Sequence, residues 1–210
     1  MKLPTYYKWI LAALFAVVVV SARSQSLTLK TNTLYDAVLV PNVGVEVNLG
    51  KQWTTSADWI FPWLFDRHKH RYWQSYGGYL TVRKYLKAHQ DVDDSVNGKR
   101  TFPKGHHVGA YFTAITYDIE FGGKGYQADD FGFGGGIEYG YSKYIGRHLD
   151  IDFTIGLGFQ DGEYKEYEPS RDQYNHYVWK ATHRRHWWGP TKAEVSIKWL
   201  LERKKKGGKR

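Results

Sequence analysis

The chain of 210 residues has no cysteine and only one methionine. Without cysteine it can hold no disulfide framework, no thiolate metal site and no lipid-modified N-terminal cysteine. Beyond the first two dozen residues it also lacks any apolar run near the roughly 20 residues that a membrane-spanning helix needs. No segment after that point shows a helical period. Strand pairing and side-chain packing are therefore expected to hold the fold together.

The N-terminus has the pattern of a cleaved secretion signal. Lys2 and Lys8 give a positive start, an apolar run covers residues 9–20, and the small residues Ala22 and Ser24 precede a cut ahead of Gln25. A permanent membrane anchor is the alternative, but the run is shorter than a spanning helix. The sequence predicts a signal peptide over residues 1–24 and an exported chain.

The net charge of +9 comes from the two ends of the chain. Removal of residues 1–24 takes away three bases and no acid, which leaves +6. Residues 202–210 carry six bases and one acid, so the part between them is close to +1. Nucleic-acid binding needs a basic face on the fold itself, and none is predicted. The tail over residues 202–210 is interpreted as a disordered basic end.

Side-chain character alternates with a period of two over long stretches of the second half. In residues 149–160, acidic, small or polar residues such as Asp150, Asp152 and Gly156 stand between the apolar ones. Aromatic residues make up 17% of the chain, and membrane barrels place such residues at the two bilayer interfaces. Together with the signal, this predicts one all-β domain over residues 25–201, an eight-stranded antiparallel transmembrane β-barrel with a filled polar interior. The apolar set in one strand is Leu149, Ile151, Phe153, Ile155, Leu157 and Phe159.

Eight strands are predicted, with turns or loops between them. If both chain ends lie in the periplasm, the polar stretch over residues 87–104 falls on the periplasmic side, where barrels have short turns. Either this stretch is an insertion or the strand count is wrong. A long polar outer loop is expected over residues 161–190. The strands are expected over residues 27–40, 42–49, 53–64, 72–86, 107–121, 130–143, 148–160 and 192–200.

The residues that alternate with the apolar ones should point into the barrel. An eight-stranded barrel is just wide enough to be filled by side chains, and buried charges must be paired. A satisfied polar plug is favoured over a proton or ion path. Asp36 and Asp58 are further interior candidates. The predicted interior network is Glu46, Arg83, Glu120, Glu138, Asp150, Asp152, Lys192, Glu194 and Lys198.

The predicted last outer loop is rich in tyrosine, tryptophan and arginine. These residue types dominate binding hot spots, but they also form interfacial girdles in membrane barrels. Both interpretations remain open from the sequence. The candidate interaction residues are Tyr164, Tyr167, Arg171, Tyr174, Tyr177, Trp179, Arg184 and Arg185.

No metal, cofactor or catalytic site is predicted. The histidines have no spacing with a known metal geometry. A hydrolytic set of Ser170, Asp172, His176 and His183 can be assembled only because these residues share a loop. Because nothing else supports this set, a non-enzymatic protein is the leading hypothesis. The alternative is a lipid-modifying barrel enzyme, such as a lipid A deacylase or acyltransferase.

Several segments resemble the domain of unknown function DUF3575. They are the Asn32-x-Leu34-Tyr35-Asp36 pattern, the stretch from Pro41 to Glu46, and the run from Gly189 to Ala193. The resemblance implies a Bacteroidetes outer-membrane β-barrel type of protein without an assigned activity, often encoded beside fimbrillin-type genes. It supplies no catalytic residues, and a basic tail after the last strand departs from the family pattern.

These observations lead to one functional hypothesis. The chain is expected to be a non-enzymatic outer-membrane protein with a structural or surface-interaction role, through analogy associated with fimbrial or adhesion biogenesis. Its expected partners are outer-membrane lipid and fimbrial or other surface proteins. Nucleic acid is not an expected partner.

Overall fold

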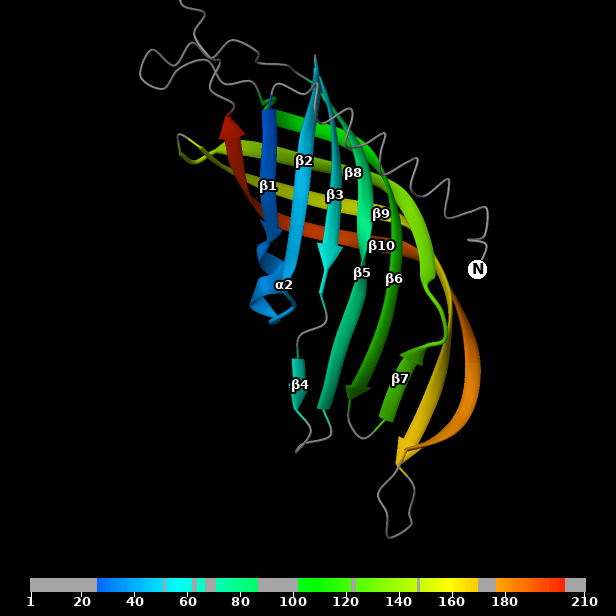
Figure 1. Cartoon of the computed structure of the whole chain (residues 1–210). Helices are drawn as coiled ribbons and strands as arrows, with labels where there is room; N and C mark the ends of the chain where they lie inside the picture. The colour runs from blue at the N-terminus through cyan, green and yellow to red at the C-terminus, as the bar shows by residue number, and fades with distance from the viewer. Residues whose placement is uncertain are drawn as a thin grey trace, which may run out of the picture.

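The computed structural model describes residues 26–50, 52–61, 64–66, 71–86, 102–121, 124–146, 148–169 and 177–202. Within these ranges the chain forms ten β-strands and one short helix, which Figure 1 labels. Their bounds are β1 Ser26–Asn32, α2 Thr33–Ala37, β2 Asn42–Gly50, β3 Trp53–Ile60, β4 Leu64–Asp66, β5 Arg71–Tyr85, β6 Gly105–Phe121, β7 Lys124–Ala128, β8 Gly132–Tyr144, β9 Leu149–Pro169 and β10 Tyr177–Glu202.

The hydrogen-bonded sheet closes on itself through eight antiparallel strands. The order around this ring is β1-β2-β3-β5-β6-β8-β9-β10, and the last strand returns to the first with Ser26 opposite Glu202. The prediction of an all-β antiparallel architecture is confirmed. Closure satisfies the backbone groups that would otherwise line a free sheet edge.

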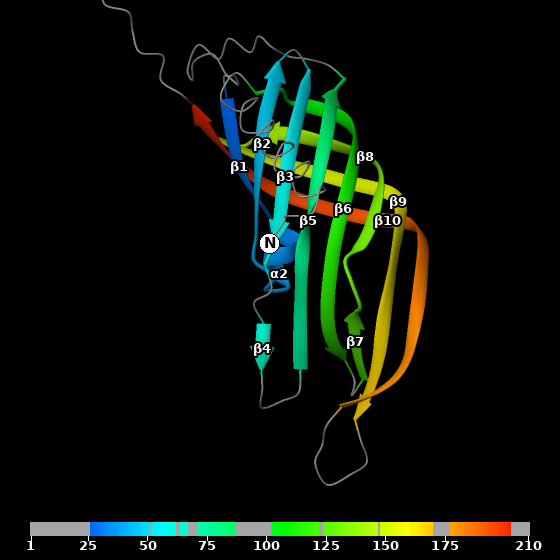
Figure 2. The same cartoon turned by 45° about the vertical axis from the view of Figure 1, so that its right-hand side comes forward.

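Beyond one end of the ring the sheet continues as an open, curved wall. The strands β9 and β10 run on as a long hairpin, β7 lies between β6 and β9, and β4 pairs with β5. Both views show the wall projecting past the point where β1, β2 and β3 stop (Figure 1, Figure 2). The wall is defined here as β4, β7 and the parts of β5, β6, β9 and β10 that extend beyond the ring.

The predicted polar loop over residues 161–190 is wrong for most of its length. The strand β9 continues to Pro169 and β10 begins at Tyr177, with Tyr164 directly opposite His183. Both faces of this hairpin carry polar residues, so it shows no apolar alternation. Cross-strand ion pairs add to the backbone ladder, and Arg184 Nη2 lies 2.9 Å from Asp161 Oδ2.

The prediction of a first strand over residues 27–40, with no helix after the signal, is also wrong. The strand β1 ends at Asn32, whose Oδ1 accepts a hydrogen bond from Leu34 N at 3.2 Å and caps α2. Leu39 then has a φ of 59°, in the left-handed region, which turns the chain back toward β2. A helix of five residues is too short to produce a recognisable sequence period.

The structure contains two short strands that the sequence does not predict. The third predicted strand, over residues 53–64, ends at Ile60, and the separate strand β4 follows. The sixth, over residues 130–143, matches β8, and β7 precedes it in a stretch where no strand is predicted. Both short strands occur where the chain passes from the ring into the wall and back.

The polar stretch over residues 87–104 joins β5 to β6. Tyr85 lies opposite His107, so the stretch begins and ends at the end of the ring that carries Ser26 and Glu202. Eight strands close the ring with this connection in place, which favours an insertion over a miscounted strand. Residues 87–101 lie outside the described residues, and Phe102 beyond them is buried.

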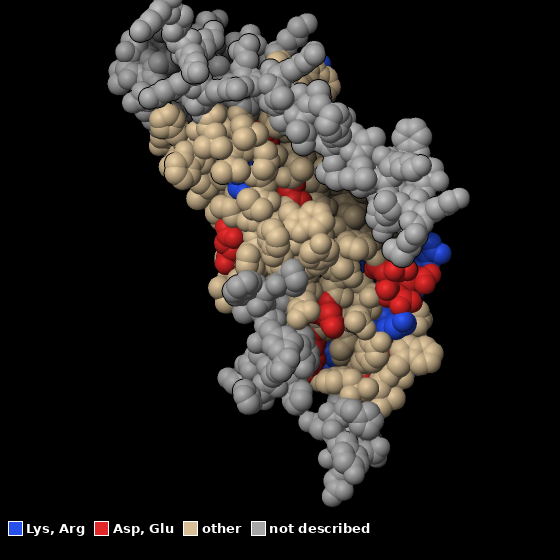
Figure 3. Space-filling model, in the orientation of Figure 1, with Lys and Arg blue, Asp and Glu red and all other residues tan. Residues whose placement is uncertain are grey.

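The outer face of the ring is apolar and exposed. Ile137, Ile155 and Leu157 are 71%, 57% and 55% exposed. In Figure 3 the upper part of the described surface is largely uncharged, and acidic and basic side chains gather lower down. We call this surface the apolar belt. Its exposed large side chains are Leu29, Val43, Leu49, Trp53, Trp59, Tyr76, Leu80, Val82, Val108, Phe112, Phe133, Ile137, Tyr139, Tyr141, Leu149, Phe153, Ile155, Leu157, Phe159, Trp188, Ile197, Trp199 and Leu201.

Aromatic rings pair at the edge of the belt that adjoins the wall. The Trp59 and Tyr76 ring centroids lie 5.1 Å apart, and those of Phe159 and Trp188 lie 5.5 Å apart. Immediately beyond this edge β9 becomes polar at Asp161. The change from apolar to polar outer surface is therefore abrupt.

Candidate functional site

Polar and charged side chains fill the interior of the ring. This reverses the burial pattern of a soluble domain, in which charged residues are rarely buried. The largest fully buried side chains include Arg83, Lys198, Tyr85 and His107. Each points inward because it alternates along its strand with a residue of the outer face.

Arg83 of β5 lies at the centre of the charged cluster. Its Nε donates to Glu138 Oε1 at 2.5 Å, and its Nη2 donates to Glu194 Oε2 at 3.1 Å. Its Nη1 lies 3.7 Å from Glu46 Oε2 and 3.8 Å from Asp152 Oδ1. One guanidinium group thus faces carboxylates from four other strands, a geometry that suits its planar fork of donors.

Lys198 and Lys192 of β10 complete the pairing on either side of Arg83. Lys198 Nζ lies 2.8 Å from both Glu46 Oε2 and Asp152 Oδ2. Lys192 Nζ lies 2.7 Å from Glu138 Oε2 and also donates to Thr81 Oγ1 at 3.0 Å. Every carboxylate beside Arg83 therefore has a second cationic or hydrogen-bonding partner.

Lys30 of β1 extends the cluster and is absent from the predicted network. Its Nζ lies 2.9 Å from both Asp58 Oδ1 and Glu194 Oε1. Its alternation with Leu27 and Leu29 is the signal that points it inward. The interpretation of β1 as a longer strand obscures that signal.

His107 and Asp152 lie toward the end of the ring that carries Ser26 and Glu202. His107 Nε2 lies 3.0 Å from Asp152 Oδ2, and the hydroxyl of Ser142 donates to the same oxygen. The serine therefore contacts the acid and not the imidazole, so this trio lacks the serine–histidine bond of a hydrolase. Tyr85 packs against His107 with ring centroids 5.1 Å apart and closes this end.

Seven of the nine residues of the predicted interior network meet in this cluster. Asp150 is also buried and lies opposite Lys198 in the strand register, and Asp58 joins through Lys30. Glu120 does not belong to the cluster. The seven are Glu46, Arg83, Glu138, Asp152, Lys192, Glu194 and Lys198.

The face of β6 that points inward is the opposite of the expected one. The sequence interpretation places Glu120 inside, and by alternation along the strand this puts Tyr111 outside. In the structure His107, Tyr111 and Thr113 are buried inside the ring, and the pairing with β5 runs on without a register shift. Glu120 therefore lies on the outer face of the wall. Apolar residues stand on both faces of β6, so alternation alone does not fix which face points inward.

A layer of tyrosines and aliphatic residues covers the charged cluster on the wall side. The hydroxyls of Tyr35 and Tyr79 lie 3.2 Å apart, and the Tyr79 and Tyr111 rings lie 6.3 Å apart. Val40 and Ile60 pack into the same group. The helix α2 supplies Tyr35, so the segment mistaken for strand forms part of this cover.

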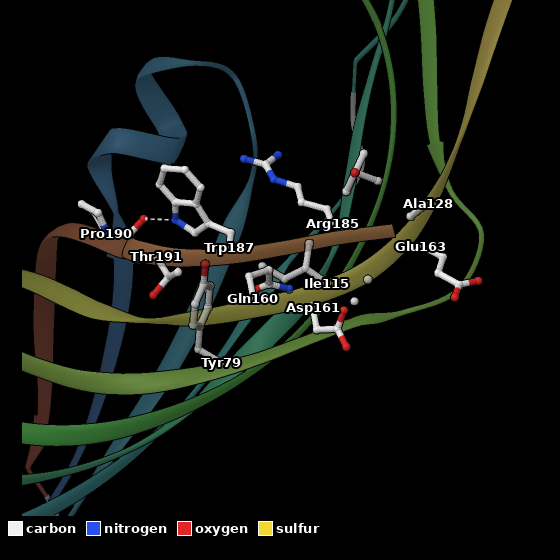
Figure 4. A pocket seen from close by; sticks show the side chains of 13 residues that line it. Tyr79, Ile115, Ala128, Gln160, Asp161, Glu163, Arg185, Trp187, Pro190 and Thr191 are labelled. Carbon is white, nitrogen blue, oxygen red and sulfur yellow. Dashed lines mark hydrogen bonds between the residues drawn. The ribbon is translucent and has the colours of Figure 1, made fainter. Parts of the chain in front are cut away.

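On the wall side of this cover lies a cavity of about 330 Å³, which we call the vestibule (Figure 4). It lies between the mouth of the ring and the inner face of the wall. Its side walls combine aromatic rings, an amide and a guanidinium group. The lining residues are Tyr79, Ile115, Tyr117, Ala128, Gly132, Gln160, Asp161, Gly162, Glu163, Arg185, Trp187, Pro190 and Thr191.

Arg185 and Trp187 project from β10 into the vestibule. The Arg185 guanidinium carbon lies 5.5 Å from the centre of the Trp187 ring, and Trp187 Nε1 donates to Pro190 O at 3.2 Å. The carboxylate of Asp161 pairs with Arg184 and with His186 instead. In the described part of the chain no carboxylate forms an ion pair with Arg185, so the vestibule presents a cation beside an aromatic face.

The candidate interaction residues divide between the two faces of the wall. Arg185 faces the vestibule, and Tyr164 lies near His183 on the same inner face, with ring centroids 5.4 Å apart. Tyr167 and Tyr177 line a second cavity together with Glu120. Trp179 and Arg184 are exposed on the wall. Arg171 and Tyr174 lie outside the described residues, as do Ser170, Asp172 and His176 of the alternative hydrolytic set.

Among the described residues no group of three histidine, aspartate or glutamate side chains is arranged to hold a metal ion. The same part of the chain contains no helix with the length and apolar character needed to span a membrane.

Comparison with known proteins identifies a family. Residues 10–201 match the family described as "Protein of unknown function (DUF3575)". The chain belongs to this family. No curated protein and no solved structure matches the chain. The structure explains why several residues of the DUF3575 pattern stand where they do.

Asn32, Asp36 and Asn42 tie the β1–α2–β2 connection together. Asn42 Oδ1 accepts from Asn32 N at 2.6 Å, and Asn42 Nδ2 donates to Asp36 Oδ1 at 2.9 Å. Asn32 also bonds the edge of β10 through Ala193 O and Val195 N. Residues of the DUF3575 pattern thus form the hydrogen bonds at the point where the pairing of β10 with β1 ends.

Gly44 and Gly189 are required for local geometry. A Cβ atom on Gly44 would overlap Asp58 Oδ1, in the space used by the Lys30–Asp58 pair. Gly189 has a φ of 148°, which glycine adopts more readily than other residues, and it precedes the register shift between Pro190 and Lys192.

Proposed function

We propose that this DUF3575 chain is a non-enzymatic outer-membrane β-barrel that presents its wall and vestibule at the cell surface as an interaction platform. The signal sequence supports export, and the apolar belt supports membrane insertion. The observation that carries the proposal is the abrupt outer boundary of the belt. On the ring side of this boundary the sheet is apolar outside and charged inside, and on the wall side both faces of the sheet carry polar side chains.

The height of the belt fits a bilayer. The apolar face of β9 runs from Leu149 to Phe159, about 33 Å at about 3.3 Å per residue. A strand tilt of about 45° reduces this to about 23 Å, near the roughly 25 Å apolar band of membrane barrels. Aromatic residues at both edges, such as Trp59 and Trp199, suit the two interfaces.

The filled interior supports a structural and interactive role over conduction. Arg83 and Lys198 are each 1% exposed and bridge the ring between carboxylates. A ring of eight strands has no room for an aqueous lumen beside such side chains. A transported ion would also have to separate these buried ion pairs, and breaking a buried pair is strongly unfavourable.

The wall is the part best placed to meet partners. It carries exposed aromatic and arginine side chains, the types enriched in binding hot spots, and one long edge of β10 beyond its pairing with β1. Outer-membrane lipid is the proposed partner of the belt. Fimbrial or other surface proteins are the proposed partners of the wall, by analogy with the genes beside other family members.

A shortened hairpin tests the proposal. Tyr164 and His183 face each other across β9 and β10, so residues 165–182 can be replaced by Asn-Gly, which favours a two-residue hairpin turn. We expect normal membrane insertion with loss of cell attachment and of cross-linking to surface proteins. Removal of residues 203–210, which follow the ring end of β10, is the matched control and should change neither.

Unchanged attachment after shortening would contradict the interaction role. A fully water-soluble, monomeric mature chain would contradict the membrane assignment itself. If the shortened chain fails to insert, the double substitution of Arg185→Gln and Trp187→Ser provides the same test within an intact sheet.

A further inference from the structure

A second cavity lies on the outer face of the wall, on the other side of the sheet from the vestibule. It has a volume of about 210 Å³ and is lined from four strands. In the strand register Asp118 is opposite Gln127, and Glu120 is opposite Gly125, which is opposite Tyr167. These side chains therefore share one face of the sheet. The lining residues are Asp118, Glu120, Gly125, Gln127, Tyr167 and Tyr177.

Glu120 is the deepest acidic group of this cavity. It is only 7% exposed, and its Oε1 accepts a hydrogen bond from the Tyr177 hydroxyl. Its second oxygen, Oε2, is shielded from water and has no hydrogen-bond partner among the described residues. A buried carboxylate oxygen without a donor is unfavourable by about 1–3 kcal/mol or more. The fold retains this oxygen although no donor in the described structure satisfies it.

The absence of a side chain at Gly125 shapes the cavity. A Cβ atom there would lie 3.3 Å from Tyr167 Cβ and 3.9 Å from Tyr177 Cδ1. The Tyr177 ring can therefore cross the β7 strand to reach Glu120. The result is a recess with two aromatic walls and a carboxylate at its base.

The acidic charge of the recess is not neutralised within the described residues. Asp118 stands two residues from Glu120 on the same strand face, and neither forms an ion pair there. Burial, followed by the negative charge of Glu120, raises the pKa of the Asp118 carboxyl. The nearby cations are engaged elsewhere, since Lys165 pairs with Asp129 and Lys124 with Glu166.

We infer that this recess binds an organic cation, an ammonium or guanidinium group, between Tyr167 and Tyr177 and against the carboxylates of Asp118 and Glu120. The aromatic walls suit a cation of this kind, which gains from facing a ring as well as from a charged hydrogen bond. A calcium ion requires six to eight oxygen ligands, whereas the recess offers two carboxylates and no third acidic ligand among the described residues.

Saturation-transfer NMR on the purified full-length chain tests the inference, with L-argininamide and spermidine as probes. The first represents a protein side chain and the second a free polyamine. We expect saturation transfer to at least one probe, with binding roughly ten- to a hundredfold weaker in Glu120→Gln, because charged hydrogen bonds are worth about that much. The glutamine amide oxygen of this variant would still accept from Tyr177, so the wall should remain folded.

Asp130→Asn is the matched control, since it removes an exposed carboxylate that lies outside the recess, in the connection between β7 and β8. It should leave probe binding unchanged. Tyr167→Leu should weaken binding while both carboxylates remain. Transfer to argininamide alone supports recognition of a protein side chain, and transfer to both probes supports a general organic-cation site.

Three results would overturn the inference. The first is that neither probe binds, and the second is that the Glu120→Gln chain binds a probe as tightly as the unchanged chain. The third is saturation by calcium at lower concentration than either probe, which would assign the recess to a metal. The test uses no membrane insertion or cell attachment, so its failure leaves the proposed surface role standing.

Discussion

Substitution of Arg83 by methionine is the sharpest test of how the interior is stabilised. Methionine is unbranched, like the stem of arginine, but it is apolar and fills irregular space well. The change therefore mainly removes the guanidinium charge and its hydrogen bonds. Glu138 and Glu194 lose direct donors at 2.5 and 3.1 Å. Because Arg83 is 1% exposed, water cannot replace those donors.

The expected loss is about 3–5 kcal/mol of unfolding free energy, the range for removing one partner of a buried ion pair. We expect a loss in the lower half of this range, because the carboxylates beside Arg83 keep a cationic partner. Lys192 still pairs with Glu138, and Lys198 still pairs with Glu46 and Asp152.

A second substitution separates pairing from packing. In the double variant Arg83→Met with Glu138→Gln, one anion leaves together with the cation, and the amide oxygen of the new glutamine would still accept from Lys192. We expect recovery of at least about 1.5 kcal/mol, the scale of coupling between groups in direct contact. Thr55→Ser, at a polar position on the same sheet outside the cluster, is the control.

The measurement is urea unfolding of the refolded chain in detergent micelles or lipid vesicles, followed by tryptophan fluorescence. If Arg83→Met changes the unfolding free energy by less than about 1 kcal/mol, or if the two substitutions are additive, the buried network does not stabilise the ring as described.

The belt and the family pattern give three further predictions. Ile155→Lys places a charge on the outer face and should cost about 2–4 kcal/mol in vesicles, against a much smaller loss for Ile155→Ala; equal losses would contradict a lipid-facing belt. Gly44→Ala should lower the unfolding free energy by about 1–3 kcal/mol because its methyl group meets Asp58, and an unchanged value would contradict the need for glycine. Asn42→Leu should speed amide hydrogen exchange in α2, since it removes the bonds to Asn32 and Asp36, and unchanged exchange would show that the helix is held otherwise.

Period-two alternation was enough to predict where most of the ring strands lie. In β9 the residues from Leu149 to Phe159 alternate apolar and polar because one face looks out of the ring and the other looks in. The same rule failed for residues 161–190. There neither face is buried against a core, so nothing in the binary pattern distinguishes a strand from a loop.

Asn32 is a helix-capping residue, but the apolar residues around it led to the prediction of a strand. Asn32 is followed at once by the helix α2, and its side chain bonds Leu34 N as a cap. The apolar residues around it satisfied a strand pattern equally well. Only the neighbouring edge of β10, which Asn32 also bonds, decides between the two.

The sequence by itself determined which side chains lie on each face of most ring strands, since alternation follows directly from the geometry of an extended backbone. Only the tertiary structure decided which charges meet. Glu46, Arg83 and Glu194 stand far apart in the chain, and they become neighbours because the first and last strands join to close the ring. Register and closure depend on all eight strands together, which no local stretch of sequence contains.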